Sequence, residues 1–364
     1  MRISILLEKF KRGLNAVDRI VSSKNTLPIL NNILIKTEDN QVVLSATDLE
    51  VGVNYYLGGK VESEGAITIP GKVLSNFINS LNEEKINLLS NNGVLSAKTE
   101  KSEASINGMA PDDFPIIPKV EGKTLAEIDG MALKQAISQV AFSVSYDESR
   151  PVLTGVYFKS DGKSLKLVAT DSYRLAEKEV VGVSVSEKID FIVPIKTINE
   201  LHRIITSSEK IKIIASENQV MFLLSDMDIV SRIIEGEYPD YEQIIPKNFK
   251  TKAVIKTAEL ANIVKTASFF AKENANNIKM NFAGNEITVE AVSSQLGNFK
   301  SKIPCTLSGE DNEISFNAKY LLDALGGLNS NEMTLEMVGK LNPGVIKPSG
   351  GNLGITYIIM PLRN

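Results

Sequence analysis

The chain has 364 residues, of which 43% are hydrophobic and 23% charged, and its formal net charge is −4. This composition is typical of a water-soluble globular protein, and no apolar run approaches the roughly 18 residues of a membrane-spanning helix. The single cysteine, Cys305, excludes an internal disulfide framework and cannot alone form a thiolate metal site. Residues 1–8 are too few and too soon charged for a signal peptide, so we expect a cytoplasmic protein.

The first third of the chain shows helical and strand patterns in alternation. Apolar residues at Phe10, Leu14, Val17 and Val21 recur at helical spacing and predict a helix over 8–22 with a basic outer face. Strand patterns then lie over 29–36, 41–47, 51–57 and 65–69, a second helix follows Pro70, and two more strands lie over 86–90 and 94–99.

The same order of elements recurs twice. Thr47-Asp48 returns 123 positions later as Thr170-Asp171, and a lysine that follows a strand returns at Lys72, Lys196 and Lys319. Because roughly 120 residues is the size of an independently cored domain, this period predicts three similar domains. Each would place two helices on one face of an antiparallel sheet, which is an α+β arrangement.

Two proline-bearing segments mark the expected boundaries. Residues 111–118 and 236–246 fix extended backbone, and both contain the loose pattern Pro-Asp-x-x-x-Ile-Ile-Pro. We therefore predict domains over 1–120, 121–246 and 247–364.

The predicted helices carry a charge opposite to that of the whole chain. Over residues 8–22, 72–81, 133–146, 196–206, 259–272 and 319–328, 11 basic residues stand against 5 acidic ones, so the helices carry +6 and the remainder −10. A solvated basic face is one explanation of this surplus. The equivalent positions of the three lysines favour a second explanation, which is binding of nucleic acid.

The candidate catalytic groups lack supporting partners. Asp48 and Asp171 occupy equivalent places in different repeats, and a Thr-Asp step at a strand end is commonly a turn that bonds its own backbone. His202 has no counterpart in the other repeats, and Cys305 has no cationic neighbour except Lys302. Because no glycine-rich phosphate loop or metal-ligand cluster is found, we expect no cofactor. A hydrolase that uses Asp171 or Cys305 is the enzymatic alternative.

Six stretches spread over the full length combine into a specific set of motifs. They are Thr47-Asp48-Leu49-Glu50, Arg150-Pro151-Val152-Leu153-Thr154-Gly155, Ala169-Thr170-Asp171-Ser172-Tyr173-Arg174-Leu175-Ala176, Gly236-Glu237-Tyr238-Pro239-Asp240-Tyr241, Phe316-Asn317 with Tyr320-Leu321-Leu322, and Tyr357-Ile358-Ile359-Met360-Pro361-Leu362-Arg363. Together they resemble the bacterial sliding clamp family, the beta subunit of DNA polymerase III. The resemblance implies a clamp fold and a head-to-tail homodimer that closes a ring around duplex DNA. It also implies a non-catalytic function, in which the ring confers processivity on the replicative polymerase.

The resemblance further assigns residues and partners. The partner-peptide cleft is expected at Leu153, Thr170, Tyr173, Arg174, Leu175, Pro239, Ile244, Ile358, Met360, Pro361, Leu362 and Arg363. DNA contact is expected at Lys24, Lys72, Lys196 and Arg203, and the dimer interface at Phe269 and Phe270. The expected partners are duplex DNA, a second copy of the chain, the polymerase alpha subunit, the clamp loader, and other replication and repair proteins that carry short linear motifs.

Two positions and the tail need separate mention. Gln243 stands where some family members carry arginine, and Asn364 stands where leucine is common. The apolar tail over 357–362 has two interpretations, a final strand or the lining of a groove.

Overall fold

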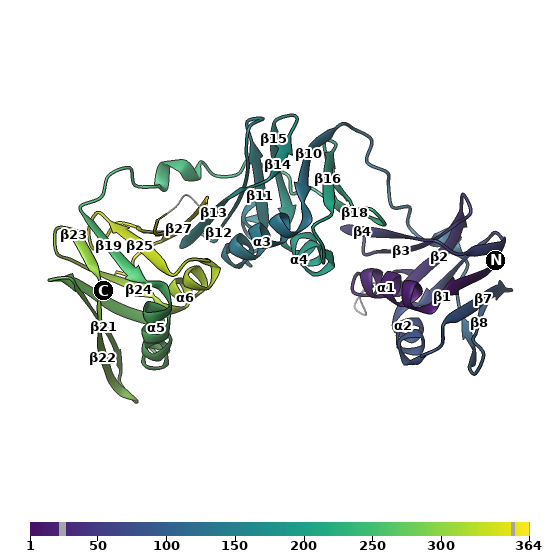
Figure 1. The fold of residues 1–364 in the computed structure, drawn as a ribbon, viewed down its shortest axis with the longest axis horizontal. Helices are drawn as coiled ribbons and strands as arrows, with labels where there is room; N and C mark the ends of the chain where they lie inside the picture. Colours follow the sequence, from purple (N-terminus) through teal and green to yellow (C-terminus); the bar gives the residue numbers. More distant parts are fainter. Residues whose placement is uncertain (22–26, 351–353, 364) are drawn as a thin grey trace. The chain divides into compact units, whose positions relative to one another are not determined.

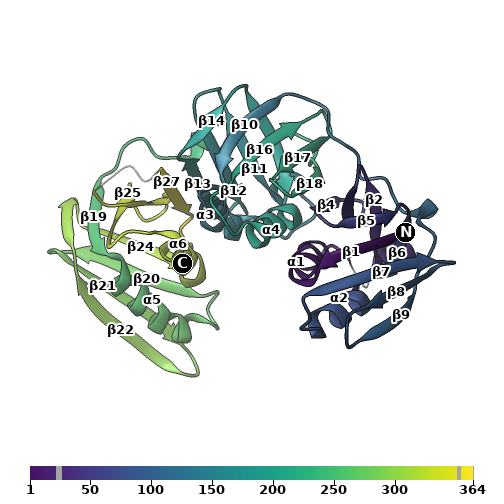
Figure 2. The ribbon, with the colours of Figure 1, turned by 45° about the vertical axis from the view of Figure 1, so that its right-hand side comes forward.

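The computed structural model describes residues 1–21, 27–350 and 354–363, which form two compact units. Unit 1 comprises Met1–Gly130 and Arg203–Ile233, and unit 2 comprises Met131–His202 and Ile234–Asn364 (Figures 1 and 2). Across the described residues, no helix is long and apolar enough to cross a membrane.

Unit 1 contains two antiparallel sheets. The first has the order β5 (Lys60–Ser63), β1 (Arg2–Leu6), β7 (Lys85–Asn91), β8 (Val94–Lys98) and β9 (Glu103–Asn107). The second runs in the order β10 (Thr124–Asp129), β16 (Lys210–Ala215), β17 (Gln219–Leu223), β18 (Met227–Arg232), β4 (Val51–Leu57), β3 (Gln41–Thr47), β2 (Asn32–Glu38) and β6 (Ala66–Pro70). Helices α1 (Leu7–Val17) and α2 (Gly71–Ser80) pack against each other, and α1 also packs on β3 and β4. The core between them is apolar, since Phe10, Leu14, Leu74 and Ile78 are fully buried.

Unit 2 repeats this plan. One sheet has the order β15 (Ile189–Pro194), β11 (Gly155–Ser160), β12 (Leu165–Thr170), β13 (Arg174–Val180), β27 (Ile355–Ile359), β26 (Gly344–Pro348), β25 (Glu332–Met337), β19 (Thr251–Lys256) and β23 (Thr306–Gly309). The other has the order β22 (Gly297–Pro304), β21 (Glu286–Ser293), β20 (Asn277–Ala283) and β24 (Asn312–Asn317). Helix α5 (Thr257–Ala271) packs on β20, β21 and β22 and against α6 (Ala318–Gly327).

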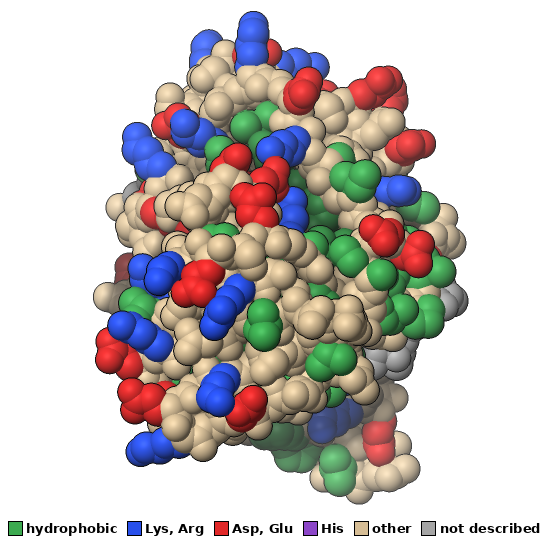
Figure 3. Space-filling model, turned by 90° about the vertical axis from the view of Figure 1, so that its right-hand side faces the viewer, with side chains coloured by type: hydrophobic (Ala, Val, Ile, Leu, Met, Phe, Trp, Pro, Cys, Tyr) green, Lys and Arg blue, Asp and Glu red, His purple; other side chains and the backbone are tan. Residues whose placement is uncertain are grey.

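The remaining elements are short or lie at the ends of the units. They are α3 (Gly130–Val140), α4 (Ile195–Ile204), β14 (Val183–Val185), and the 3₁₀ turns η1 (Pro28–Asn31), η2 (Pro111–Asp113), η3 (Ala141–Ser143), η4 (Pro151–Leu153) and η5 (Tyr241–Ile244). The predicted fold class is confirmed, because the helix pairs α1/α2, α3/α4 and α5/α6 follow the three repeats with antiparallel sheet between them. On the face shown in Figure 3, basic and acidic side chains are interspersed, and hydrophobic side chains gather toward one side.

Two of the sheets join strands from different repeats. In unit 1, β18 from the second repeat pairs with β4 from the first, and in unit 2, β27 from the third repeat pairs with β13 from the second. Each of these sheets therefore runs through an expected domain boundary, and the contacts across that boundary gather the three repeats into two compact units. The boundaries at 120 and 246 stay a prediction.

The first helix is shorter than its sequence pattern. The prediction reached residue 22, whereas α1 ends at Val17. Ile20 N then donates to the carbonyl of Val17, and Val21 N to that of Asp18, in tight turns of the 3₁₀ type. Ile20 and Val21 are nevertheless buried, so apolar periodicity alone did not reveal that the α-helix had ended.

The repeated Thr-Asp step forms the same turn twice. Thr47 Oγ1 donates to the carbonyl of Val51 at 2.9 Å, and Asp48 Oδ1 accepts the N–H of Val51 at 2.9 Å. In the second copy, Thr170 Oγ1 donates to the carbonyl of Arg174 at 2.6 Å, and Asp171 Oδ1 accepts the N–H of Arg174 at 3.0 Å.

Both turns also share an unusual backbone conformation. The third turn residue has a positive φ in each copy, 77° at Leu49 and 75° at Ser172. A positive φ costs free energy at a residue other than glycine, and the side-chain hydrogen bonds of the turn offset that cost. The prediction that Thr-Asp is a structural turn is thus confirmed.

Candidate functional site

The residues expected to bind peptide surround the antiparallel pair of β13 and β27 in unit 2. Leu175 and Ile358 lie directly opposite each other in this pair, and both are buried. They belong to an apolar cluster to which the linker over 236–246 contributes Tyr241 and Ile245. Cross-strand apolar pairs of this kind stabilise a sheet and define one face of it. The two strands, this linker and the tail together are the place of the expected peptide-binding cleft, and we call them the β13/β27 cleft.

The rim of the β13/β27 cleft keeps accessible side chains. Tyr173 is 64% exposed and Met360 is 38% exposed, and the N–H of Met360 donates to the carbonyl of Tyr173 at 2.9 Å. On the linker, Ile244 is 46% exposed and Pro239 is also exposed. Exposed apolar side chains beside a buried apolar floor are typical of a binding surface.

The tail forms both a strand and a further segment. Strand β27 ends at Ile359, two residues before Pro361, which has no N–H to donate to a sheet. Beyond it, the N–H of Leu362 donates to the carbonyl of Ser315 at 2.9 Å, while Arg363 is exposed. The interpretation as a final strand is therefore confirmed for Ile355–Ile359. Lining of a groove by the last residues stays a prediction, and Asn364 lies outside the described residues.

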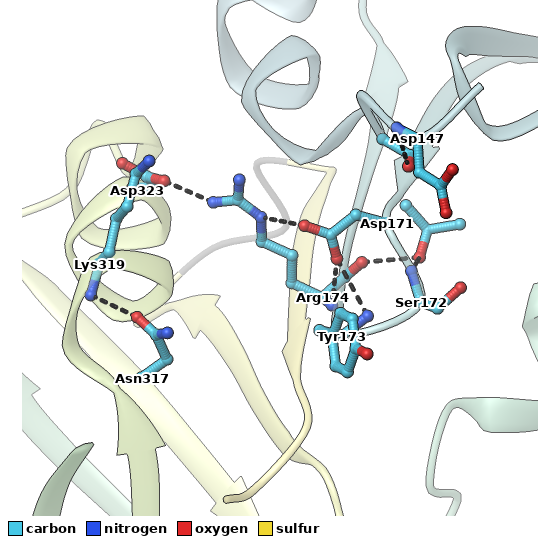
Figure 4. A network of polar contacts seen from close by, with 10 residues as sticks. Asp147, Asp171, Ser172, Tyr173, Arg174, Asn317, Lys319 and Asp323 are labelled. Atoms are coloured by element: carbon cyan, nitrogen blue, oxygen red, sulfur yellow. Dashed lines mark hydrogen bonds and ion pairs between the residues drawn. The ribbon is translucent and has the colours of Figure 1, made fainter. Parts of the chain in front are cut away.

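Arg174 lies beneath the rim and is only 9% exposed. Its Nε donates to Asp171 Oδ2 at 3.0 Å, and its Nη1 donates to Asp323 on α6 (Figure 4). Its guanidinium also lies 4.5 Å from the ring centre of Tyr320 and 5.5 Å from that of Phe142. The two carboxylates and the two aromatic rings offset the free-energy cost of removing the Arg174 guanidinium from water. Arg174 therefore ties the β12–β13 turn to α6, and its binding of a peptide group stays a prediction.

The other two predicted cleft residues lie deeper in the structure. Thr170 is buried, and its hydroxyl is used by the turn. Leu153 is buried at the end of η4, and the neighbouring Val152 packs against the apolar cluster of the β13/β27 cleft. Both residues support the cleft from within.

Several contributors to this site were not predicted. Val345 of β26 belongs to the apolar cluster, and Tyr238 stacks on Tyr157 with ring centroids 4.6 Å apart. The hydroxyl of Tyr241 donates to Glu177 Oε2 at 2.6 Å, and burial with this hydrogen bond raises the pKa of Tyr241. The repeated Ile-Ile-Pro sequence indicated that the linker packs on the sheet, whereas no sequence pattern around Val345 indicated its place in the cluster.

The residues expected to contact DNA have different surroundings. Lys72 and Lys196 are exposed, as is Lys319 at the equivalent position of the third repeat, and each is the second residue of a helix, in α2, α4 and α6 respectively. A cation at a helix N-terminus opposes the helix dipole at a cost of about 0.3–1 kcal/mol, so helix stability does not explain these lysines. Arg203 donates to the carbonyls of Asn15 and Ala16 at 2.8 Å, which caps the C-terminal end of α1. Lys24 lies outside the described residues.

The two phenylalanines expected at the dimer interface end α5. Phe269 is 53% exposed, and Phe270 stacks on Phe299 of β22 with centroids 5.8 Å apart. Strand β22 is an edge of its sheet, and β9 is an edge in unit 1. Edge strands with unpaired backbone groups readily pair with another chain.

The candidate catalytic residues are not arranged for chemistry. The Asp171 carboxylate is engaged by backbone N–H groups and by Arg174. Burial and the nearby Glu286 raise the pKa of Cys305, which disfavours the reactive thiolate. Burial and Lys134 lower the pKa of His202. Within the described residues, no group of three or more histidine, cysteine or acidic side chains could hold a metal ion.

Comparison with known proteins agrees over the whole chain. Residues 1–118, 127–240 and 242–363 match the N-terminal, central and C-terminal domain models of the DNA polymerase III beta subunit. A beta sliding clamp of Staphylococcus epidermidis is 32% identical, with 100% of this chain and 99% of the relative covered. The crystal structure of a DNA polymerase sliding clamp from Bacillus subtilis, 28% identical, superimposes with a TM-score of 0.95 over 100% of this chain and 99% of that one. A DNA polymerase III beta subunit from Thermotoga maritima, 26% identical, gives 0.93 with the same coverage. The chain therefore belongs to the DNA polymerase III beta subunit family, the bacterial beta sliding clamps, which are non-catalytic processivity factors.

Proposed function

We propose that this protein acts in the bacterial cytoplasm as a closed head-to-tail dimer that encircles duplex DNA and tethers the replicative polymerase. The observation that carries the proposal is the repeated lysine at the start of α2, α4 and α6. Because each lysine opposes its own helix dipole, helix stability does not account for the repeated lysine, and we assign to it contact with the phosphates of DNA. Lysine contacts to phosphate carry no base information, which suits a protein that slides along any sequence.

The sheet edges and Phe269 support closure into a dimer. Pairing of β22 in one chain with β9 in the next would satisfy both edges, and the same contact would cover Phe269 and the Phe270–Phe299 stack. Two such contacts close a two-fold ring when the rotation permits. The domains over 1–120, 121–246 and 247–364 would be the repeating units of that ring.

The β13/β27 cleft supports the binding of partners. A buried apolar floor, accessible Tyr173, Ile244 and Met360, and a linker beside them suit an extended peptide. Methionine adapts its shape to different apolar side chains, so one cleft could serve several partners. We therefore assign to it short linear motifs of the polymerase alpha subunit, the clamp loader, and other replication and repair proteins.

Retention on DNA tests the ring. The purified dimer, loaded on nicked circular duplex DNA, should stay bound through gel filtration and should dissociate when a restriction enzyme linearises that DNA. The variant with Lys72→Glu and Lys319→Glu should load poorly. Lys163→Glu, an equal charge change on the exposed β11–β12 turn, is the matched control and should load normally. Retention unchanged by linearisation would refute encirclement.

Peptide titration tests the cleft. Deletion of residues 360–364 should abolish binding of a polymerase C-terminal peptide while dimerisation is kept. The deletion removes the hydrogen bonds of Met360 and Leu362 to the rest of unit 2, so we expect a stability loss of only about 1–3 kcal/mol. Met360→Ala should weaken binding, whereas Leu341→Ala, which truncates an exposed residue between β25 and β26, should not. Unchanged affinity of the truncated protein would place the site elsewhere.

A further inference from the structure

Unit 1 contains a second copy of the backbone arrangement that forms the β13/β27 cleft. Strand β4 pairs with β18 as β13 pairs with β27, and each pair begins beside a Thr-Asp turn. The hydrogen bond that follows the last paired residues is also the same in both copies. Arg232 N donates to the carbonyl of Glu50 at 3.1 Å, just as Met360 N donates to the carbonyl of Tyr173. We call this second copy, together with the linker over 111–118, the β4/β18 cleft.

The two linkers pack on their sheets in the same way. In the Ile-Ile-Pro step of each linker, the second isoleucine joins an apolar cluster on the sheet, Ile117 in unit 1 and Ile245 in unit 2. The first isoleucine points outward, and Ile116 is 92% exposed. An isoleucine exposed to this degree contributes little to the fold, so its apolar surface is available to a ligand.

The β4/β18 cleft contains a pocket of about 390 Å³ that is open to solvent. Leu49 and Ile116 are its accessible apolar residues, and Val51, Gly52 and Val230 also line it. A volume of this size falls within the roughly 300–1,000 Å³ range of ligand pockets.

The floor of this cavity differs from that of the β13/β27 cleft. Gly52 takes the place of Leu175, and a Cβ atom built there would lie 2.8 Å from Cγ2 of Ile117. The linker side chain therefore fills the space that Leu175 fills in unit 2. Glycine at this position allows the linker to approach the sheet closely.

The polar rim also differs. Arg232 occupies the position of Met360, is exposed, and forms no ion pair within the part of the chain that the structure describes. Glu50 lies across the strand pair from Arg232 and also lines the cavity without pairing with it. In unit 2, by contrast, the buried Arg174 is neutralised by two carboxylates. The β4/β18 cleft thus offers an available cation beside exposed apolar surface.

We propose that the β4/β18 cleft is a second peptide-binding site, which takes an extended segment with a large apolar side chain next to an acidic residue. The apolar side chain would lie between Leu49 and Ile116, and the carboxylate would pair with Arg232. The choice of an acidic segment follows from charge complementarity with Arg232. The proposal rests on the proposed function to the extent that both clefts take short extended peptides.

Photo-crosslinking separates the two sites. The probe is a decapeptide that carries photo-leucine followed by aspartate within glycine and serine residues, and it is irradiated with the full-length dimer. We expect crosslinks both to residues 47–52 or 111–118 and to the β13/β27 cleft. Crosslinks confined to the β13/β27 cleft would overturn the second site and leave the proposed function intact. Crosslinks confined to the β4/β18 cleft would support the second site and refute the proposed use of the first, and crosslinks at neither cleft would refute both.

Charge and surface variants test the assigned residues. Ile116→Asp should lower affinity at the β4/β18 cleft by about tenfold or more. Because Ile116 is exposed, this variant should fold normally and keep its crosslinks at the β13/β27 cleft. Arg232→Gln should weaken binding of the acidic probe about two- to fivefold, and Glu50→Gln should strengthen it by removing a like charge. Equal effects of Arg232→Gln and Glu50→Gln on binding would overturn the assignment. A changed sedimentation coefficient of Ile116→Asp would also overturn it, because it would show that a second copy of the chain covers this cleft.

Discussion

Replacing Asp323 by asparagine should loosen the β13/β27 cleft without unfolding unit 2. Asp323 accepts a hydrogen bond from Arg174, whose side chain is 9% exposed, while the Asp323 side chain is 29% exposed. Complete loss of a partner from a buried ion pair costs about 3–5 kcal/mol, which is an upper limit here. Asp171 still pairs with Arg174 at 3.0 Å, and an amide oxygen can still accept a hydrogen bond. We therefore expect a loss of about 1–2 kcal/mol in the free energy of local opening.

Hydrogen exchange of the amides in β13 and β27 measures that free energy. A double-mutant cycle of Asp323→Asn with Arg174→Gln should give a coupling of about 1–2 kcal/mol, since both changes remove the ionic part of the same contact. Asp311→Asn is the matched control, because Asp311 is exposed and forms no ion pair within the described chain. A coupling below about 0.3 kcal/mol would be within the error of additivity and would refute the role assigned to the pair.

Three further outcomes follow from single changes. Lys72→Glu should leave α2 equally stable, or more stable by up to about 2 kcal/mol, in thermal melts, and a destabilised helix would contradict the dipole argument. The same change should lower by about one unit the slope with which the logarithm of DNA affinity falls with the logarithm of salt concentration. Phe269→Asp should give monomers in sedimentation with an intact fold, because the side chain is half exposed, and an unchanged dimer would exclude it from the interface. Lys159 lowers the pKa of Glu242 through a 2.7 Å hydrogen bond, so the pair stabilises the linker at neutral pH and that contribution is lost as pH falls through the lowered pKa. Lys159→Gln should reduce the pH dependence of the melting temperature between about pH 6 and pH 3. A pH profile identical to that of the unchanged protein would show that the pair does not contribute to stability.

The sequence by itself determined the features that depend on neighbouring residues. Helix and strand patterns recur in each repeat because each domain must bury apolar side chains with the same periodicities. The Thr-Asp turns were predictable because the hydrogen bonds that close each turn lie within five residues, from Thr47 to Val51 and from Thr170 to Arg174. The prolines of both linkers likewise restrict their own backbone, whatever surrounds them.

Only the tertiary structure decided which distant groups meet. Arg174 and Asp323 are 149 positions apart, and nothing local to either residue indicates the other. The family resemblance assigned Arg203 to DNA contact, and the fold also uses its side chain to cap a helix that ends 186 positions earlier. The pairing of β18 with β4 and of β27 with β13 joins different repeats, and such pairing depends on how apolar faces of separate segments pack together. The periodicity of one segment specifies that it has an apolar face, and the partner of that face is specified only when the whole core is assembled.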